Sequence, residues 1–101
     1  VLITSLATSN ALRMVYQEIA ATLKATPKKI ILVETSTLAM TDKDWIAQQL
    51  PKKQVALLDC PISGTAARMK DRAWTIFVSG KKSSCNEVQP IFKCYPITHL
   101  M

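Results

Sequence analysis

Short apolar runs alternate along this chain with longer segments in which apolar residues recur every three or four positions. The runs are four to six residues long and rich in β-branched side chains, which is typical of buried strands. They predict strands over residues 1–6, 30–33, 55–58, 75–78 and 97–100. The order strand, helix, strand, helix, strand, loop, strand, helix, strand predicts an α/β fold, with a mainly parallel sheet and helices on both faces.

The segment between residues 9 and 26 has the clearest helical spacing. Ser9 and Asn10 offer an N-terminal cap, and Pro27 with the two lysines after it ends the helix. The apolar positions that share one face are Leu12, Val15, Tyr16, Ile19, Ala20 and Leu23. This face is expected to pack on the sheet.

Two further helices are predicted from capping boxes. Thr41 with Asp44 opens one, and Ser84 with Glu87 opens the other, in which Pro90 should kink the helix or shorten its first turns. The side chains expected to face inward are Trp45, Ile46, Gln49 and Leu50 in the first, and Val88, Ile91, Phe92 and Tyr95 in the second. Residues 66–72 fit either a short helix or an ordered loop.

Composition limits the class of protein. The 101 residues have room for one small domain, and 49% apolar with 20% charged residues is ordinary globular composition. No apolar run reaches the roughly 18 residues of a membrane span, and no signal peptide is evident. The three cysteines (Cys60, Cys85 and Cys94) form no CxxC pair, so we expect no disulfide framework, no metal site and an intracellular, reducing compartment.

The formal net charge of +6 comes largely from lysines. They occur as the pairs 28–29, 52–53 and 81–82, each beside a predicted strand or helix end and without aromatic residues between them. Nucleic-acid-binding proteins concentrate positive charge on one face, so we interpret the pairs as solvated loop edges. The excess charge fits an anionic ligand better than a nucleic acid or a membrane.

The candidate chemistry lies at two strand ends. Residues 34–37 (E-T-S-T) and 59–65 (D-C-P-I-S-G-T) follow buried strands and carry several hydroxyl groups. Pro61 cannot donate to a strand ladder, and Gly64 permits a close backbone approach. Ligands of open α/β sheets bind beyond the carboxyl ends of the strands, which favours a binding site here.

Two alternatives stay open for these strand ends. Thr35, Ser36 and Thr37 could simply cap the next helix. Ser63 could be read as a nucleophile, but the G-x-S-x-G elbow is absent and His99 is the only histidine, which argues against a serine–histidine triad.

Three ordered segments resemble the β-hydroxyacid dehydrogenases, which include 3-hydroxyisobutyrate dehydrogenase and relatives of 6-phosphogluconate dehydrogenase. Residues 31–37 (I-L-V-E-T-S-T) are similar to a family strand ending in D-S-S-T. Residues 57–65 (L-L-D-C-P-I-S-G-T) resemble D-A-P-V-S-G-G, and residues 75–80 (T-I-F-V-S-G) resemble T-I-M-V-G-G. Residues 6–9 (L-A-T-S) match the family's L-P-x-S, so the resemblance covers essentially the whole chain.

The resemblance implies that residues 1–101 are the C-terminal half of a Rossmann-type NAD(P)-binding domain. In this family hydride passes between a small 3-hydroxy acid and NAD or NADP. Leu6, Ala7 and Thr37 match positions that contact the dinucleotide. The loop that binds the substrate carboxylate corresponds to Ser63, Gly64 and Thr65. The resemblance also implies a homo-oligomeric parent protein.

The same resemblance places the glycine-rich phosphate turn before Val1, and the catalytic lysine and helical domain beyond Met101. The isolated chain is therefore expected to be a fragment that contains no catalytic residue and is inactive.

Departures from the family pattern keep a non-catalytic binding or assembly domain as the alternative. Ala7 replaces proline, Glu34 replaces aspartate, and Thr65 replaces glycine. Arg68 and Arg72, with Met69 between them, stand where small residues are usual, and are either exposed or selective for a more acidic substrate.

Overall fold

The computed structural model describes residues 1–26, 28–64, 70, 74–93 and 97–100. The elements among them are β1 (Leu2–Thr4), α1 (Ser9–Ala25), β2 (Ile30–Glu34), α2 (Met40–Gln49), β3 (Val55–Asp59), β4 (Ile62–Ser63), β5 (Thr75–Val78), α4 (Lys82–Phe92) and β6 (Ile97–Leu100). The predicted strands and helices are all present, and β4 is an additional short strand. The predicted helix or loop at 66–72 lies outside the described residues except for Lys70.

The first three strands form a parallel sheet in the order β1-β2-β3. Beyond β3 the direction changes, because β4 pairs with β5 antiparallel, while β5 and β6 are parallel. An isolated bridge between Asp59 and Ser79 continues the register of the β4–β5 pairs, so β3 and β4 act as one bent strand beside β5. The strands thus form two three-stranded sheets, β1-β2-β3 and β4-β5-β6, which this bridge joins. The predicted mainly parallel pairing is confirmed, with one antiparallel seam that the apolar pattern did not reveal.

Pro61 explains why this bent strand is split in two. The Phe77 N–H donates to the Pro61 carbonyl over 3.0 Å, but proline has no N–H with which to return the bond. At the neighbouring pair, Asp59 and Ser79 exchange both backbone bonds, each at 3.0 Å. The prediction that Pro61 stops the strand ladder is therefore confirmed only for the one hydrogen bond that a residue with an N–H would have donated here.

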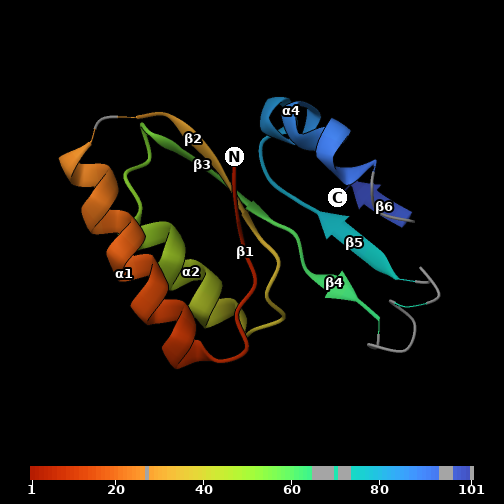
Figure 1. Cartoon of the computed structure of the whole chain (residues 1–101), viewed down its shortest axis with the longest axis horizontal. Helices are drawn as coiled ribbons and strands as arrows, with labels where there is room; N and C mark the ends of the chain where they lie inside the picture. Colours follow the sequence, from red (N-terminus) through yellow and green to blue (C-terminus); the bar gives the residue numbers. More distant parts are fainter. Residues whose placement is uncertain (27, 65–69, 71–73, 94–96, 101) are drawn as a thin grey trace.

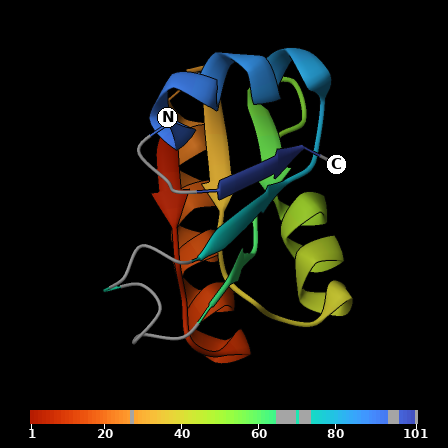
Figure 2. The ribbon, with the colours of Figure 1, turned by 90° about the vertical axis from the view of Figure 1, so that its right-hand side faces the viewer.

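Helices cover both faces of the sheet, as predicted (Figures 1 and 2). On β2, Leu32 belongs to a core cluster with residues of α1 and α2, whereas Val33 belongs to a second cluster with residues of α4. Successive strand residues point to opposite faces, so one strand contributes to both cores. Tyr16 of α1 and Val88 of α4 are fully buried on their respective sides.

The first strand is shorter and more exposed than predicted. Only residues Leu2–Thr4 form β1, and the exposed fractions of Val1, Leu2 and Ile3 are 64%, 40% and 44%. Among the described strands, β1 pairs with β2 alone, so it is an edge strand with an open side. The prediction of a buried strand over residues 1–6 is wrong for its first three side chains.

The predicted caps are also displaced. The Thr8 hydroxyl, not Ser9 or Asn10, caps α1 by accepting from the Ala11 N–H over 3.1 Å. The other two helices begin earlier than their expected capping boxes, after Ala39 and Lys81, and neither has a side-chain cap. The starts of these two helices therefore do not depend on a side-chain cap. Pro90 does lie inside α4, which runs on to Phe92.

No helix among the residues described above is long and apolar enough to cross a bilayer.

Candidate functional site

The last residues of the three parallel strands meet at one edge of the sheet. Thr4 pairs with Glu34, and Glu34 pairs with Asp59, so β1, β2 and β3 end at the same level. In Figure 1 the loops after β1 and β2 run down from this edge, and the chain after β3 continues to β4. The predicted binding edge therefore exists as a continuous polar border, which we call the carboxyl edge (Thr4, Glu34, Asp59 and the loops after them).

Glu34 is the centre of this edge, although it is only 1% exposed. The Tyr16 hydroxyl donates to Glu34 Oε2 over 2.8 Å, the Thr4 hydroxyl donates to the same oxygen, and the Ser36 N–H donates to Oε1 over 2.6 Å. Thr4 Oγ1 also lies 2.6 Å from the Tyr16 hydroxyl oxygen. Glu34 thus connects the ends of two strands to α1.

These donors decide the charge of the carboxyl group. Burial alone would raise the pKa of Glu34, but the hydrogen bonds from Ser36, Thr4 and Tyr16 outweigh it and hold the pKa below its ordinary value. Burial raises the pKa of Tyr16, which therefore stays a neutral donor at physiological pH. The network is a buried carboxylate held by hydroxyl and amide groups.

Lys43 of α2 supplies the positive charge opposite this carboxylate. Its Nζ lies 2.8 Å from Asp59 Oδ1 and 3.7 Å from Glu34 Oε1, and it donates to the Ser36 carbonyl over 2.7 Å. The Lys43 side chain is 10% exposed and the Asp59 side chain 35% exposed, so the pair is partly shielded from solvent. One lysine therefore fixes α2 to the ends of β2 and β3.

The predicted dinucleotide loops are joined directly. The Leu6 N–H donates to the Ser36 hydroxyl over 2.7 Å, and Thr35 donates to the Thr4 carbonyl through both its N–H and its hydroxyl. Leu6 is half-buried, whereas Ala7 and Thr37 are exposed. The structure thus brings the loops of Leu6, Ala7 and Thr37 to one edge and leaves two of the three side chains accessible.

The helix-capping alternative for residues 35–37 is wrong. Thr35 and Ser36 bond to the loop after β1, and α2 begins at Met40 with no side-chain cap. Their hydroxyls instead fix the two loops relative to each other.

The predicted substrate loop is described only in its first half. Ser63 closes β4 opposite Thr75, and Ser63 and Gly64 are both exposed. Gly64 has φ +149°, a conformation that side chains rarely adopt, which accounts for glycine at this turn. Thr65, Arg68, Met69 and Arg72 lie outside the described residues.

Cys60 lies along the chain between the loop after β2 and the turn after β4, and it is not a nucleophile. Its side chain is fully buried, and burial raises the pKa of the thiol to about 12. Cys85 is also a free, buried thiol in the same core cluster. Both pack as small apolar side chains, as predicted.

The buried network contains residues that the sequence did not single out. Tyr16 looked like one more apolar position on a helix face, and Lys43 was not considered. Glu34 was noted only as a mild change from aspartate. A carboxylate directly after a buried strand was the one available signal. Among the described residues, no three side chains of metal-binding type form a group that could hold a metal ion.

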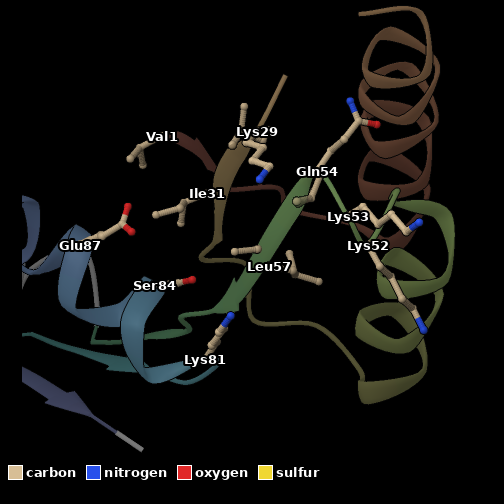
Figure 3. Close-up of a pocket in the computed structure, with 13 residues that line it drawn as sticks. Val1, Lys29, Ile31, Lys52, Lys53, Gln54, Leu57, Lys81, Ser84 and Glu87 are labelled. Atoms are coloured by element: carbon tan, nitrogen blue, oxygen red, sulfur yellow. The ribbon is translucent and has the colours of Figure 1, made fainter. Parts of the chain in front are cut away.

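A cleft of about 600 Å³ opens at the opposite edge of the sheet (Figure 3). It is lined by Val1, by the first residues of β2 and β3 and the residues before them, and by the start of α4. None of the predicted site residues lines it. This cleft is therefore not at the carboxyl edge.

Comparison with known proteins places the chain. The sequence model of the family described as "NAD binding domain of 6-phosphogluconate dehydrogenase" matches residues 1–98. The chain belongs to this family. The fold and the expected nicotinamide dinucleotide cofactor agree with the resemblance found in the sequence.

Two curated relatives carry the same name. The chain is 32% identical over 91 residues to an L-threonate dehydrogenase of Haemophilus influenzae, which covers 90% of this chain and 29% of that protein. It is 32% identical over 74 residues to an L-threonate dehydrogenase of Pectobacterium atrosepticum, covering 73% and 23%. The chain thus spans less than a third of the length of these relatives, which are oxidoreductases.

Solved structures show the same fold. A 3-hydroxyisobutyrate dehydrogenase of Mycobacterium tuberculosis, solved with L-serine, superposes with a TM-score of 0.76 at 22% identity over 98% of this chain and 33% of that one. Psf3, solved with NADP+ and 2-OPP, gives a TM-score of 0.77 at 18% identity over 99% and 36%. The chain is therefore a Rossmann-type α/β unit that corresponds to about a third of such a dehydrogenase.

Proposed function

We propose that this chain supplies part of the cofactor and substrate site of an NAD(P)-dependent dehydrogenase acting on a small 3-hydroxy acid. The observation that carries the proposal is the joined pair of loops after β1 and β2, in which Leu6 N–H bonds to the Ser36 hydroxyl. Family membership sets the cofactor class. The accessible residues beside this junction, Ala7 and Thr37, are the proposed dinucleotide contacts.

The proposed substrate end is the turn after β4. Ser63 and Gly64 are exposed there, and a hydroxyl with backbone N–H groups suits a carboxylate. Thr65 completes this loop in the proposal. Glu34 and Lys43 do not touch the ligand in this scheme; they hold the strand ends and α2 in the geometry that the loops require.

The proposal assigns the remaining parts of the reaction to sequence outside the chain. Hydride transfer to the nicotinamide requires the phosphate-binding glycine turn, and proton transfer at the substrate hydroxyl requires a general acid or base. The parent protein is proposed to be a homo-oligomer. The free thiols of Cys60 and Cys85 are compatible with an intracellular, reducing compartment.

A chimera tests the proposal. In the Haemophilus influenzae L-threonate dehydrogenase, the segment matching 91 residues of this chain would be replaced by the chain itself. We expect NAD(P)-dependent oxidation of a small hydroxy acid, and no turnover by the 101-residue chain alone. A folded chimera without cofactor binding would contradict the proposal.

Two pairs of variants of the chimera sharpen this test. Thr37→Ala should raise the KM for the dinucleotide about tenfold, and Ser63→Ala should raise the KM for the hydroxy acid by a similar factor. Thr22→Ala on α1 and Ser83→Ala on α4 are matched controls, because both side chains are exposed and lie on helices away from these loops.

If the chimera does not fold, titration of the isolated chain with NAD+ and NADP+ followed by amide NMR shifts still decides the cofactor claim. Weak binding with shifts at Leu6, Ala7 and Thr37 supports it, and shifts elsewhere contradict it.

A further inference from the structure

Members of all three lysine pairs are among the residues that line the cleft opposite the carboxyl edge. Lys29 precedes β2, Lys52 and Lys53 precede β3, and Lys81 precedes α4. In Figure 3 the side chains of Lys52 and Lys53 point away from Ser84 and Lys81. Only one carboxylate, that of Glu87, is among its described lining residues. All four lysines are exposed, which confirms their interpretation as solvated loop edges. We call this region the amino edge (the cleft and its lysines).

The N-terminus of α4 opens on the same cleft. Its first turn begins at Lys82 after Lys81, and no side chain caps it. The first N–H groups of a helix have no partner within the helix, and together with the helix dipole they attract negative charge. Gly80 brings this terminus close to the sheet: it has φ +146°, and a Cβ at this position would collide with the Leu58 side chain.

Ser84 provides an independent indication of a ligand. It lies in the first turn of α4, is 7% exposed and lines the cleft. Its hydroxyl has no hydrogen-bond partner among the described residues, and in Figure 3 it points from α4 into the cleft. A polar side chain that is more than nine-tenths buried normally has a partner. Here the open direction leads into a cavity surrounded by positive charge.

We propose that the amino edge binds a phosphate-bearing anion. Ser84 Oγ and the free N–H groups of the first turn of α4 donate to its oxygens, and Lys81 pairs with its charge. Lys29 adds a further positive charge on the opposite side of the cleft. This site is separate from the proposed dehydrogenase site, because the two use opposite edges of the sheet.

The lining favours phosphate over other anions. A single carboxylate would leave most of the lysine charge in the cleft uncompensated, whereas a phosphate or pyrophosphate group carries several acceptor oxygens and more than one charge. The described walls include Ile31 and Leu57 but no aromatic side chain on which a nucleic-acid base could stack. We therefore argue for a small phosphate-bearing ligand rather than a nucleic acid.

The test is a titration of the ¹⁵N-labelled 101-residue chain with inorganic pyrophosphate, at constant ionic strength maintained with sodium chloride. We expect saturable shifts of the amide signals of residues 82–84. Ser84→Ala should raise the Kd about tenfold, since a hydrogen bond to a charged group is lost. Ser83→Ala is the matched control, because Ser83 is exposed and does not line the cleft.

A second pair of variants tests the charge. Lys81→Gln should raise the Kd about tenfold or more, whereas Lys93→Gln, at the far end of the same helix, should change it less than twofold. Both substitutions remove one charge from an exposed side chain, so they remain informative if Ser84→Ala fails to fold.

Further arms distinguish the source of the phosphate group. Binding of inorganic phosphate alone and binding of ribose 5-phosphate both support the site, and their relative Kd values show whether an organic part adds affinity. Absence of saturation, or equal effects of Lys81→Gln and Lys93→Gln, overturns the proposal. A single-stranded oligonucleotide that binds tightly and is not displaced by pyrophosphate overturns it as well.

Discussion

The two edges of the sheet are built from opposite kinds of polar group. At the carboxyl edge, hydroxyls and an amide donate to Glu34, and Lys43 forms an ion pair with Asp59. At the amino edge, lysines line the cleft and the Ser84 hydroxyl faces it. The polar groups of the first edge bond mainly to one another, whereas donors of the second edge face the cleft.

This difference indicates how each edge is affected by a ligand. At the carboxyl edge, the hydrogen-bonded network already holds the loops in place, so a ligand does not have to order them when it binds. An edge with excess donors and positive charge is itself stabilised when an anion binds. Substitutions at the carboxyl edge should therefore change mainly the stability of the fold. Substitutions at the amino edge should change mainly the binding of an anion.

The largest effect is expected from removing the centre of the carboxyl edge. Glu34→Ala leaves the Thr4 and Tyr16 hydroxyls and the Ser36 N–H without their acceptor. We expect the free energy of unfolding to fall by about 3 kcal/mol or more, measured by urea denaturation. Glu18→Ala, at an exposed position on α1, should change it by less than about 0.5 kcal/mol. Equal losses of unfolding free energy in the two variants would contradict the expected difference between the buried network and the exposed surface.

The pH dependence of stability follows from the same carboxylate. Because the folded pKa of Glu34 lies below its ordinary value, its contribution is fully present above the unfolded pKa of about 4.3. It is lost as the pH falls through the folded pKa. Between about pH 5 and pH 2, the wild-type chain should therefore lose stability more steeply than Glu34→Gln. Parallel curves from thermal unfolding would show that Glu34 is not ionised in the fold.

A smaller effect on stability is expected at α1, which is the one described helix with a side-chain cap. Thr8→Ala removes the acceptor of the Ala11 N–H and should destabilise the chain by about 1 kcal/mol. Thr22→Ala, an exposed position within the same helix, serves as the control and should have almost no effect. The comparison is made by chemical denaturation at neutral pH.

The smallest effect on stability is expected at the amino edge, where it couples to binding. Lys81→Asp places a carboxylate at the uncapped start of α4 and should stabilise the chain by about 0.5–1 kcal/mol. The same change should abolish pyrophosphate binding, because the new carboxylate occupies the donors. Lys93→Asp makes the same charge change at the C-terminal end, where it should bring no stabilisation. A stabilised Lys81→Asp variant that still binds pyrophosphate would show that the anion binds elsewhere.

Much of the fold could be predicted from local pattern. The apolar face from Leu12 to Leu23 and the buried runs of β2, β3 and β5 were found by their spacing, which reports burial directly. The helix starts were not, because Thr41 and Ser84 looked like caps, whereas α2 and α4 begin at Met40 and Lys82 without a side-chain cap. The antiparallel seam at β5 was missed as well, since an apolar run carries no direction.

The candidate site divides in the same way. The order and spacing of residues 31–37, 57–65 and 75–80 were enough to indicate the family, now shown by the match over residues 1–98. The roles of Leu6, Ala7, Thr37, Ser63, Gly64 and Thr65 stay predictions. The bonds of Glu34 to Tyr16 and Thr4 join residues 18 and 30 positions away in sequence, which no local pattern reveals.

The sequence by itself determined the alternation of strands and helices, the buried faces and the family, because these depend on spacing along one chain. Only the tertiary structure decided which polar groups meet. It joined the ends of three strands into one satisfied network, and it gathered lysines from three separate segments around one cleft. Charges that look evenly spread along a sequence become a site only when strand register and helix packing bring them within reach of one another.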